Sequence, residues 1–153
     1  MFNFGSSSKL APWLALSMVG IGMAQTPRLN LRLLEGRYSV CRLGAAEKAP
    51  AWAANAKGFS SATRTADELS VVCADAAVPT GTKCETGWRI FKIEGPLDFS
   101  LIGILVSVTK PLADAKVSIF SISTYDTDYV FVKEAELEKA IGAITAAGHR
   151  VKR

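Results

Sequence analysis

The residues best suited to do chemistry form a polar segment between two apolar runs, at residues 123–128. Its sequence, Ser-Thr-Tyr-Asp-Thr-Asp, is rich in side chains that hydrogen-bond to nearby backbone in tight turns. The carboxylate of Asp128 is also able to accept a hydrogen bond from the ammonium group of a ligand. Turn chemistry within the loop is an alternative interpretation of Asp128, and more so of Asp126. The segment therefore predicts a polar corner at one end of a sheet, where a small ligand could be held.

A predicted helix start faces this corner from another part of the chain. The helix is expected over residues 101–115, with Ser100 or Asp98 as its N-cap. The first N–H groups of a helix lack intrahelical partners and favour an anion, such as the carboxylate of an amino acid. Gly103 would let a ligand or another backbone approach closely, although helix packing is an alternative reason for a glycine there. The two elements together predict a site for a zwitterion.

Catalytic chemistry finds little support in the sequence. Nucleophilic catalysis by Cys or Ser usually needs a general base, and His149 is the only histidine. It follows Gly148, a helix-ending glycine, and is predicted to cap that helix. Neither a GxGxxG pattern nor a P-loop occurs. We therefore predict a protein that is not an enzyme and needs no cofactor.

The three cysteines do not form a metal-binding pattern. Cys41, Cys73 and Cys84 include no CxxC pair, and the single histidine adds no chelating partner. We predict three small, reduced and partly buried side chains, and no metal site. A Cys73–Cys84 bridge would form only if the chain were exported.

The charge of the chain excludes some partners. The net charge of +4 is mild, and 49% hydrophobic residues are too many for a disordered chain. The clearest basic cluster is the tail at residues 149–153, which is predicted to be a solvated chain end. Because no nucleic-acid motif accompanies it, neither a nucleic acid nor a membrane is predicted as a partner.

Four strands and two helices are needed to position the corner and the helix start. Strand-forming residues occupy 88–94, and further strands flank the corner at 117–123 and 128–133. Residues 134–147 form the clearest amphipathic helix of the chain, and a last strand begins near Val151. The resulting order, strand–helix–strand–strand–helix–strand, is that of a ferredoxin-like unit.

The first half repeats this layout in a reduced form. Strands are expected at residues 29–33, 38–43, 59–64 and 69–74, with a short helix at 50–56. Residues 65–68 have the spacing of a capping box, but the strand-like run behind them indicates a turn within a hairpin. We predict an α+β fold of two ferredoxin-like (βαββαβ) units side by side, at 28–86 and 87–153, the first with a reduced helix. Pairing the units would cover their sheet edges and helix faces.

Residues 1–25 form an apolar extension with three open interpretations. Lys9 precedes an apolar run that is shorter than the roughly 20 residues needed to span a bilayer. The run is a cleaved signal peptide, an extra helix packed on the domain, or the product of a start codon assigned too early, with Met23 as the true start. We favour the last interpretation or a loosely attached segment. A cytoplasmic protein is therefore predicted, with an exported protein as the alternative.

In the segments that form the predicted helix start and the polar corner, the chain resembles the ACT-domain family of small regulatory ligand-binding modules. More narrowly, it is similar to the bacterial tandem-ACT proteins related to the animal cytosolic arginine sensors. In the second half the resemblance rests on Gly-Pro-Leu-Asp-Phe-Ser-Leu-Ile-Gly at 95–103, Pro-Leu-Ala-Asp-Ala at 111–115, and the corner at 123–128. In the first half the segments at 33–43 and 67–73 also fit.

The resemblance implies that an amino acid is bound at an interface between ACT units, between the loop entering the first helix and the strand corner. The residues that it places there are Asp98, Phe99, Leu101, Ile102, Gly103, Ser118, Ile119, Thr124, Tyr125 and Asp128. Leu101 stands where the arginine sensors place a carboxylate that meets the cationic ligand. This departure removes a charge-assisted contact and counts against arginine as the ligand.

Two functions follow from this reading of the sequence. The first is a regulatory module that binds a small amino-acid-like molecule as its partner, with a homodimer as a further assembly. The alternative is a structural or dimerisation module whose paired units associate through edge strands or helix faces without a ligand. The sequence names neither the ligand nor the protein that such a module would regulate.

Overall fold

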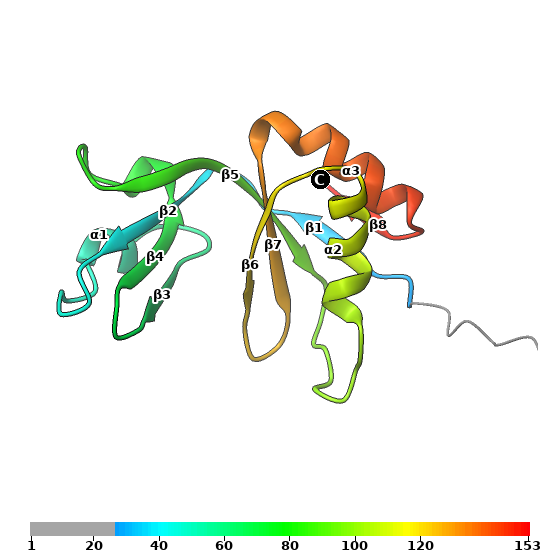
Figure 1. The fold of residues 1–153 in the computed structure, drawn as a ribbon, viewed down its shortest axis with the longest axis horizontal. Helices are drawn as coiled ribbons and strands as arrows, with labels where there is room; N and C mark the ends of the chain where they lie inside the picture. The colour runs from blue at the N-terminus through cyan, green and yellow to red at the C-terminus, as the bar shows by residue number, and fades with distance from the viewer. Residues whose placement is uncertain (1–26) are drawn as a thin grey trace, which may run out of the picture.

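The computed structural model describes residues 27–153 (Figure 1). The interpretations of the apolar extension at residues 1–25 fall outside this part of the chain. The described strands form one mixed sheet: β1 Asn30–Leu33, β2 Tyr38–Leu43, β3 Ser61–Arg64, β4 Leu69–Ala74, β5 Cys84–Ile93, β6 Ile119–Ser123, β7 Asp128–Lys133 and β8 Arg150–Lys152. The helices are α1 Ala51–Ala54, α2 Ile104–Asp114 and α3 Leu137–Ala146, with short 3-10 turns at Asp75–Ala77 and Glu134–Glu136. Among residues 27–153, none of the helices has the length and apolarity that crossing a membrane requires.

The second half has the predicted ferredoxin-like order. Strand β5 is followed by α2, the β6–β7 hairpin, α3 and β8. Strand β7 pairs antiparallel with both β5 and β6. In Figure 1, α2 and α3 lie beside each other at the end of the molecule away from β3 and β4. The first half has β2, β3 and β4 but only the four-residue α1, so the predicted α+β class with a reduced helix in the first unit is confirmed.

Strand β5 joins the two halves of the sheet. Its first residues pair with β2, and residues 88–92 pair with β7. Strand β1 lies between β5 and β8, antiparallel to β5 and parallel to β8. The strand that was expected to open the first unit therefore lies in the sheet of the second half. The unit boundary between residues 86 and 87 stays a prediction, and β5 runs across it.

The largest apolar core lies between the sheet and the two longer helices. Val108 and Leu112 of α2 are one turn apart, and both are fully buried, as is Ile144 of α3. Burying one such side chain contributes about 1.5–3 kcal/mol relative to leaving it exposed. A second, aromatic cluster around Trp88 and Phe131 is separate from this core. The helices therefore supply most of the apolar cover of the second half.

The amide of His149 donates to the carbonyl of Ile144 at 3.3 Å at the end of α3, in line with the predicted cap, but its side chain has a different role. Helix α2 continues through Pro111, whose ring nitrogen has no hydrogen to donate to the carbonyl of Ser107 one turn earlier. His149 Nε2 lies 3.0 Å from this Ser107 carbonyl oxygen. The amide of Leu29 donates to His149 Nδ1 at 3.2 Å, so Nδ1 is the acceptor and Nε2 carries the proton. The buried imidazole thus replaces the missing donor of Pro111 and ties α2 to the start of β1.

The turn at residues 65–68 is a hairpin turn, as predicted, and not a helix start. It joins β3 to β4, which pair antiparallel. The Thr65 amide donates to the carbonyl of Glu68 at 2.9 Å, and the Thr65 hydroxyl accepts from the amide of Asp67 at 3.2 Å. The capping-box spacing therefore serves a turn here, because strand residues follow it.

The cysteine prediction was wrong for two of the three residues. Cys41 of β2 and Cys84 of β5 are cross-strand partners and form a disulfide bridge. Cys73 is free and fully buried, and burial, together with the nearby Asp75 carboxylate, raises the pKa of its thiol. Sequence spacing did not indicate the Cys41–Cys84 pair. The two residues meet because of the pairing register of β2 and β5, which depends on how distant segments pair.

Candidate functional site

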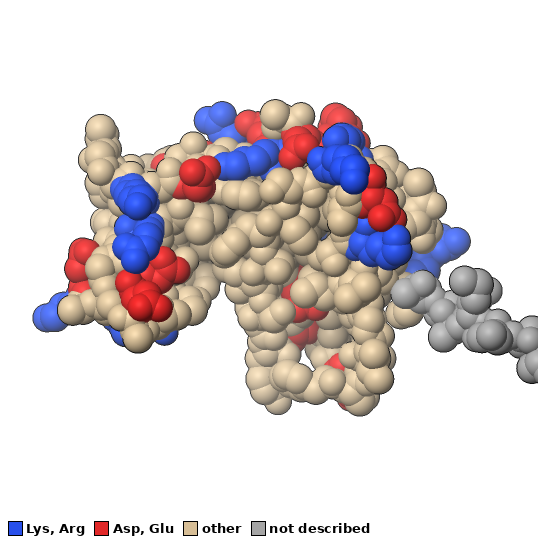
Figure 2. Space-filling view, viewed as in Figure 1, with Lys and Arg blue, Asp and Glu red and all other residues tan. Residues whose placement is uncertain are grey.

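A cavity of about 220 Å³ separates the β6–β7 corner from the loop that leads into α2. Figure 2 shows acidic atoms in the gap between these two elements, which project together from the lower side of the molecule. The residues that line the cavity come from both elements: Leu97, Asp98, Phe99, Leu101, Ile104, Ser123, Thr124, Tyr125, Asp126, Thr127 and Asp128. The corner and the loop therefore face each other, as the sequence predicted.

The corner is held in place by hydrogen bonds from its threonines. The amide and the hydroxyl of Thr124 both donate to the carbonyl of Thr127, at 2.8 and 2.9 Å. The Thr127 hydroxyl donates to the carbonyl of Ile93 and so fastens the corner to β5. Thr127 is buried, while Thr124 is exposed towards the cavity. The threonines in this motif mainly set the shape of the turn.

The loop is fastened to the corner at its base. The amide of Leu97 donates to the carbonyl of Asp126 at 2.8 Å. A Cβ on Gly95 would stand 2.7 Å from the same carbonyl oxygen, which is closer than real contacts allow. Glycine at position 95 is thus required for the close approach of the two segments. This contact holds the loop against the corner.

Asp128 keeps part of its carboxylate available to a ligand. The hydroxyl of Ser123 donates to Asp128 Oδ1 across the ends of β6 and β7. Among residues 27–153, no donor reaches the second oxygen of this carboxylate. Asp128 is half-buried at the cavity wall. A partly buried carboxylate with a free oxygen can accept a charge-assisted hydrogen bond.

The helix start lies later than the sequence predicted. Asp98 accepts hydrogen bonds from the hydroxyl and the amide of Ser100, at 2.6 and 2.8 Å, and so forms a turn of its own before the helix. Helix α2 begins at Ile104, after Gly103, whose φ of 78° is left-handed. The Ser100 hydroxyl and amide lower the pKa of the Asp98 carboxyl, which favours its charged form. Ile104, the first helical residue, lines the cavity.

Two aromatic rings meet at the mouth of the cavity. The rings of Phe99 and Tyr125 stand edge to face, with centroids 5.3 Å apart. Their residues are 78% and 81% exposed, respectively. Phe99 belongs to the loop and Tyr125 to the corner, so their contact bridges the two elements. The rings lie at the rim and leave most of their surface open to solvent.

The charges around the cavity are of one sign. The lining residues include the carboxylates of Asp98, Asp126 and Asp128 and no lysine, arginine or histidine. Such a lining favours a group with a positive charge, such as an ammonium. Helix α2 begins at Ile104, which lines the cavity, and the start of a helix favours an anion.

Six of the ten residues predicted for the site line this cavity: Asp98, Phe99, Leu101, Thr124, Tyr125 and Asp128. Ile102 and Gly103 belong to the same loop but do not line it, and Ile102 is 93% exposed. Ile119 is the first residue of β6, about 13 Å from Ser123 at the corner at roughly 3.3 Å per strand residue, and Ser118 precedes it. Their assignment to the same site therefore does not fit the geometry.

The cavity also includes residues outside the predicted set, namely Leu97, Ile104, Ser123, Asp126 and Thr127. All five are neighbours in sequence of residues that were predicted. The predicted hairpin could have placed Ser123 at the site, because Ser123 pairs with Asp128 and paired residues share one face of a sheet. Nothing in the sequence indicated Leu97, whose position depends on the contact between Gly95 and the corner.

The sequence matches known protein families over most of the described residues. A family model described as the ACT domain matches residues 83–146, and a second model, which describes an N-terminal domain, matches residues 36–81. A crystal structure of a protein from Agobacterium tumefaciens is 42% identical and has a TM-score of 0.78, covering 82% of this chain and 93% of that one. Residues 83–146, the second half of the chain, belong to the ACT domain family.

Other solved structures resemble this ACT-domain chain in fold. A Vibrio cholerae protein of unknown function, titled a possible transport protein, is 17% identical with a TM-score of 0.62, over 80% of this chain and 91% of that one. The regulatory subunit of aspartate kinase from Thermus thermophilus is 14% identical with a TM-score of 0.54, over 77% and 97%. At these identities the likeness concerns the fold. Comparison with curated proteins gives no match.

Proposed function

We propose that this ACT-domain protein is a regulatory module, not an enzyme, that binds a small amino-acid-like ligand between the loop and the corner. The observation that carries the proposal is one cavity lined both by the start of α2 at Ile104 and by the carboxylate of Asp128. These two groups are complementary to the carboxylate and the ammonium of a zwitterion. Of the ten predicted residues, the six that line the cavity enter the proposal, with Asp128 as the ammonium acceptor.

The size of the cavity supports a small ligand. A volume of about 220 Å³ has room for several groups of the size of a water molecule. It is below the roughly 300–1,000 Å³ of pockets that hold drug-sized molecules. A small amino acid fits this space better than a nucleotide does.

The charge of the cavity refines the relation to the arginine sensors that the sequence resembles. Leu101 lines the cavity, and the resemblance implies that the arginine sensors have a carboxylate at its position. Asp98, Asp126 and Asp128 nevertheless surround the same space. We therefore propose that the ammonium group of the ligand contacts these aspartates. Leu101 favours a ligand whose side chain ends in an apolar group instead of a guanidinium. The aspartate kinase regulatory subunit with a similar fold supports a regulatory role.

Calorimetry with a panel of amino acids tests the proposal. We expect one or a few of them to bind wild-type protein, and Asp128→Asn to weaken binding at least tenfold because a charge-assisted contact is lost. Asp114→Asn is the matched control, since Asp114 is exposed on α2 and pairs with Lys110 outside the cavity. Binding that Asp128→Asn leaves unchanged, or no binding by any amino acid, would contradict the proposal.

An apolar surface supports the alternative of a dimerisation module. Large apolar side chains are exposed next to the cavity mouth: Phe99, Leu101, Ile102, Val106 and Tyr125. Exposed apolar groups gathered in one place are typical of interaction surfaces. Light scattering of Ile102→Glu against wild type, with and without the best amino acid, separates the two functions. A dimer that Ile102→Glu dissociates while amino acids bind to neither state would favour the alternative.

The compartment in which the module works is a separate proposal. The sequence predicted a cytoplasmic protein with export as the alternative. The Cys41–Cys84 bridge supports export, because disulfides persist mainly in oxidising compartments. Mass spectrometry of the native protein, with and without thiol alkylation, counts free thiols and reads the N-terminus together. Three alkylated cysteines in freshly lysed cells would support the cytoplasm.

A further inference from the structure

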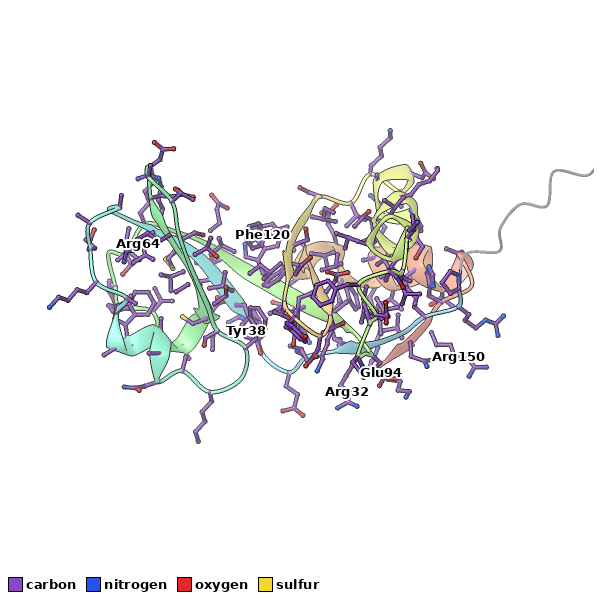
Figure 3. The ribbon with its side chains drawn as sticks, turned by 90° about the horizontal axis from the view of Figure 1, so that it is seen from below. Arg32, Tyr38, Arg64, Glu94, Phe120 and Arg150 are labelled. Atoms are coloured by element: carbon purple, nitrogen blue, oxygen red, sulfur yellow. A yellow bond between two sulfur atoms is a disulfide. The ribbon has the colours of Figure 1, made fainter. Side chains whose placement is uncertain are left out.

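A second cavity of about 830 Å³ lies where the two halves of the chain meet. In Figure 2 the lower side of the molecule is hollowed between the β3–β4 end and the β6–β7 hairpin. Figure 3 views this side, with Tyr38 lying between the two halves. The cavity is lined from both halves: Leu34, Glu35, Gly36, Tyr38, Lys57, Gly58, Phe59, Ser60, Ala74, Lys92, Thr124 and Tyr129. It is distinct from the corner cavity, and Thr124 alone lines both.

Aromatic rings form the apolar part of this cavity. Phe59, in the loop between α1 and β3, reaches the second half, where its ring centroid lies 4.6 Å from that of Tyr129 and 5.7 Å from that of Phe131. It also lies 6.5 Å from the ring of Tyr38. Phe59 and Tyr129 are only half-buried, so part of this aromatic surface faces the open space. Such a surface is suited to the face or edge of a flat ring.

The hydroxyl of Tyr38 is a polar group that faces the cavity without a partner. Tyr38 is 3% exposed, and none of residues 27–153 hydrogen-bonds to its hydroxyl. The lack of a side chain at Gly58 leaves this hydroxyl uncovered, since a Cβ there would stand 3.0 Å from it. The hydroxyl oxygen can be reached from the cavity and is open to a hydrogen-bond partner, because it is not among the fully buried unpaired side-chain atoms of the described residues. The cavity is the place from which a ligand would supply one.

The charges of this cavity are opposite to those of the corner. Lys57 and Lys92 line it, and within the described part of the chain neither has a carboxylate within the 4.0 Å of an ion pair. Lys92 Nζ lies over the ring of Tyr129, 6.0 Å from its centroid. Glu35 is the acidic residue of the lining, and it is exposed at the rim. The lining thus carries one positive charge more than negative charges and favours an anion.

We propose that the cavity between the two halves binds a planar aromatic carboxylate. Its ring packs against Phe59 and Tyr129, and its carboxylate accepts hydrogen bonds from Lys92 and from the hydroxyl of Tyr38. The ligand would touch both halves and hold them in one relative position. This site is independent of the proposed amino-acid site, because the two cavities differ in lining and in the sign of their charge.

Titration of the ¹⁵N-labelled full chain with 2-naphthoate, followed by NMR, tests the proposal. We expect saturable shift changes for residues 34–38, 57–60 and 92, and none of that size for residues 97–101. Lys92→Gln should weaken 2-naphthoate binding about tenfold, and Tyr38→Phe about threefold, because the lysine contact joins two opposite charges whereas the tyrosine hydroxyl is a neutral donor. Lys83→Gln, which removes an exposed charge outside the cavity, is the matched control and should bind as wild type.

Two further probes on wild-type protein keep the test independent of any variant's folding. The neutral 2-naphthamide and the non-aromatic decahydro-2-naphthoate should each bind at least fivefold more weakly than 2-naphthoate. Equal binding of the amide would refute the anionic site, and equal binding of the saturated acid would refute the aromatic one. Shift changes confined to residues 97–101 and 123–128, or no binding at millimolar concentration, would overturn the proposal without affecting the amino-acid titration.

Discussion

The two halves of the sheet are stabilised by different means. In the second half, α2 and α3 cover the sheet and bury a large cluster that includes Val108, Leu112 and Ile144. In the first half α1 has four residues, and the buried cluster around Leu69 and Val71 is much smaller. The first half instead has the bridge between β2 and β5. A unit that has lost its helical cover depends more on a covalent link and on the strand that it shares with its neighbour.

The largest expected effect comes from a matched pair of leucines. Leu112 and Leu69 are 0% and 2% exposed, one in each half. We expect Leu112→Ala to lower the free energy of unfolding by about 4 kcal/mol and Leu69→Ala by about 2 kcal/mol, because a thin layer collapses around a cavity more easily than a thick core does. Urea denaturation measures both. Equal losses would contradict the difference between the halves.

Removing the bridge tests the first half directly. It closes a segment with a sequence separation of 43 residues, and the double change Cys41→Ser with Cys84→Ser should cost about 3 kcal/mol. Hydrogen exchange should show the loss mainly in β2, β3 and β4. Reductant should destabilise wild type to the same extent and leave the double variant unchanged. If reduction speeds hydrogen exchange in α2 and α3 as much as in β2, β3 and β4, the bridge does not stabilise the first half in particular.

His149→Phe tests a polar contact in the second half. The change leaves the carbonyl of Ser107 and the amide of Leu29 without their partners, and we expect a loss of about 2–3 kcal/mol in the free energy of unfolding. Adding Pro111→Ala restores a backbone donor to Ser107 and should recover part of that loss. A double variant no more stable than His149→Phe would show that the ring does not act through Ser107.

The smallest effect concerns the loop before α2. Ser100 lowers the pKa of Asp98, so this interaction stabilises the fold above the unfolded pKa of Asp98 and is lost as pH falls through the lower folded value. Ser100→Ala should therefore raise the pKa of Asp98 towards its ordinary value, with little change in stability at pH 7. Carbon-detected NMR titration of the carboxyl measures it. An unchanged pKa would show that the loop turn is not held by Ser100.

The order of elements in the second half was predictable because local signals agree with each other. Apolar strands alternate with segments of helical period, and the Ser-Thr-Tyr-Asp-Thr-Asp motif marks the hairpin between β6 and β7. The same local signals identified the turn at residues 65–68. They failed at the start of α2, since Asp98 and Ser100 form a separate turn that delays the helix to Ile104. Turns and helix caps use the same residue types, so sequence reasoning misplaces such boundaries.

The sequence by itself determined the α+β class, the polar corner and the aspartates that the corner presents, because these depend on residues close together in the chain. Only the tertiary structure decided which residues from distant segments meet. It inserted β1 between β5 and β8, paired Cys41 with Cys84, turned His149 towards Ser107, and removed Ser118 and Ile119 from the corner cavity. Each of these outcomes depends on strand register and on the packing of separate elements. A periodic pattern along one segment does not encode them.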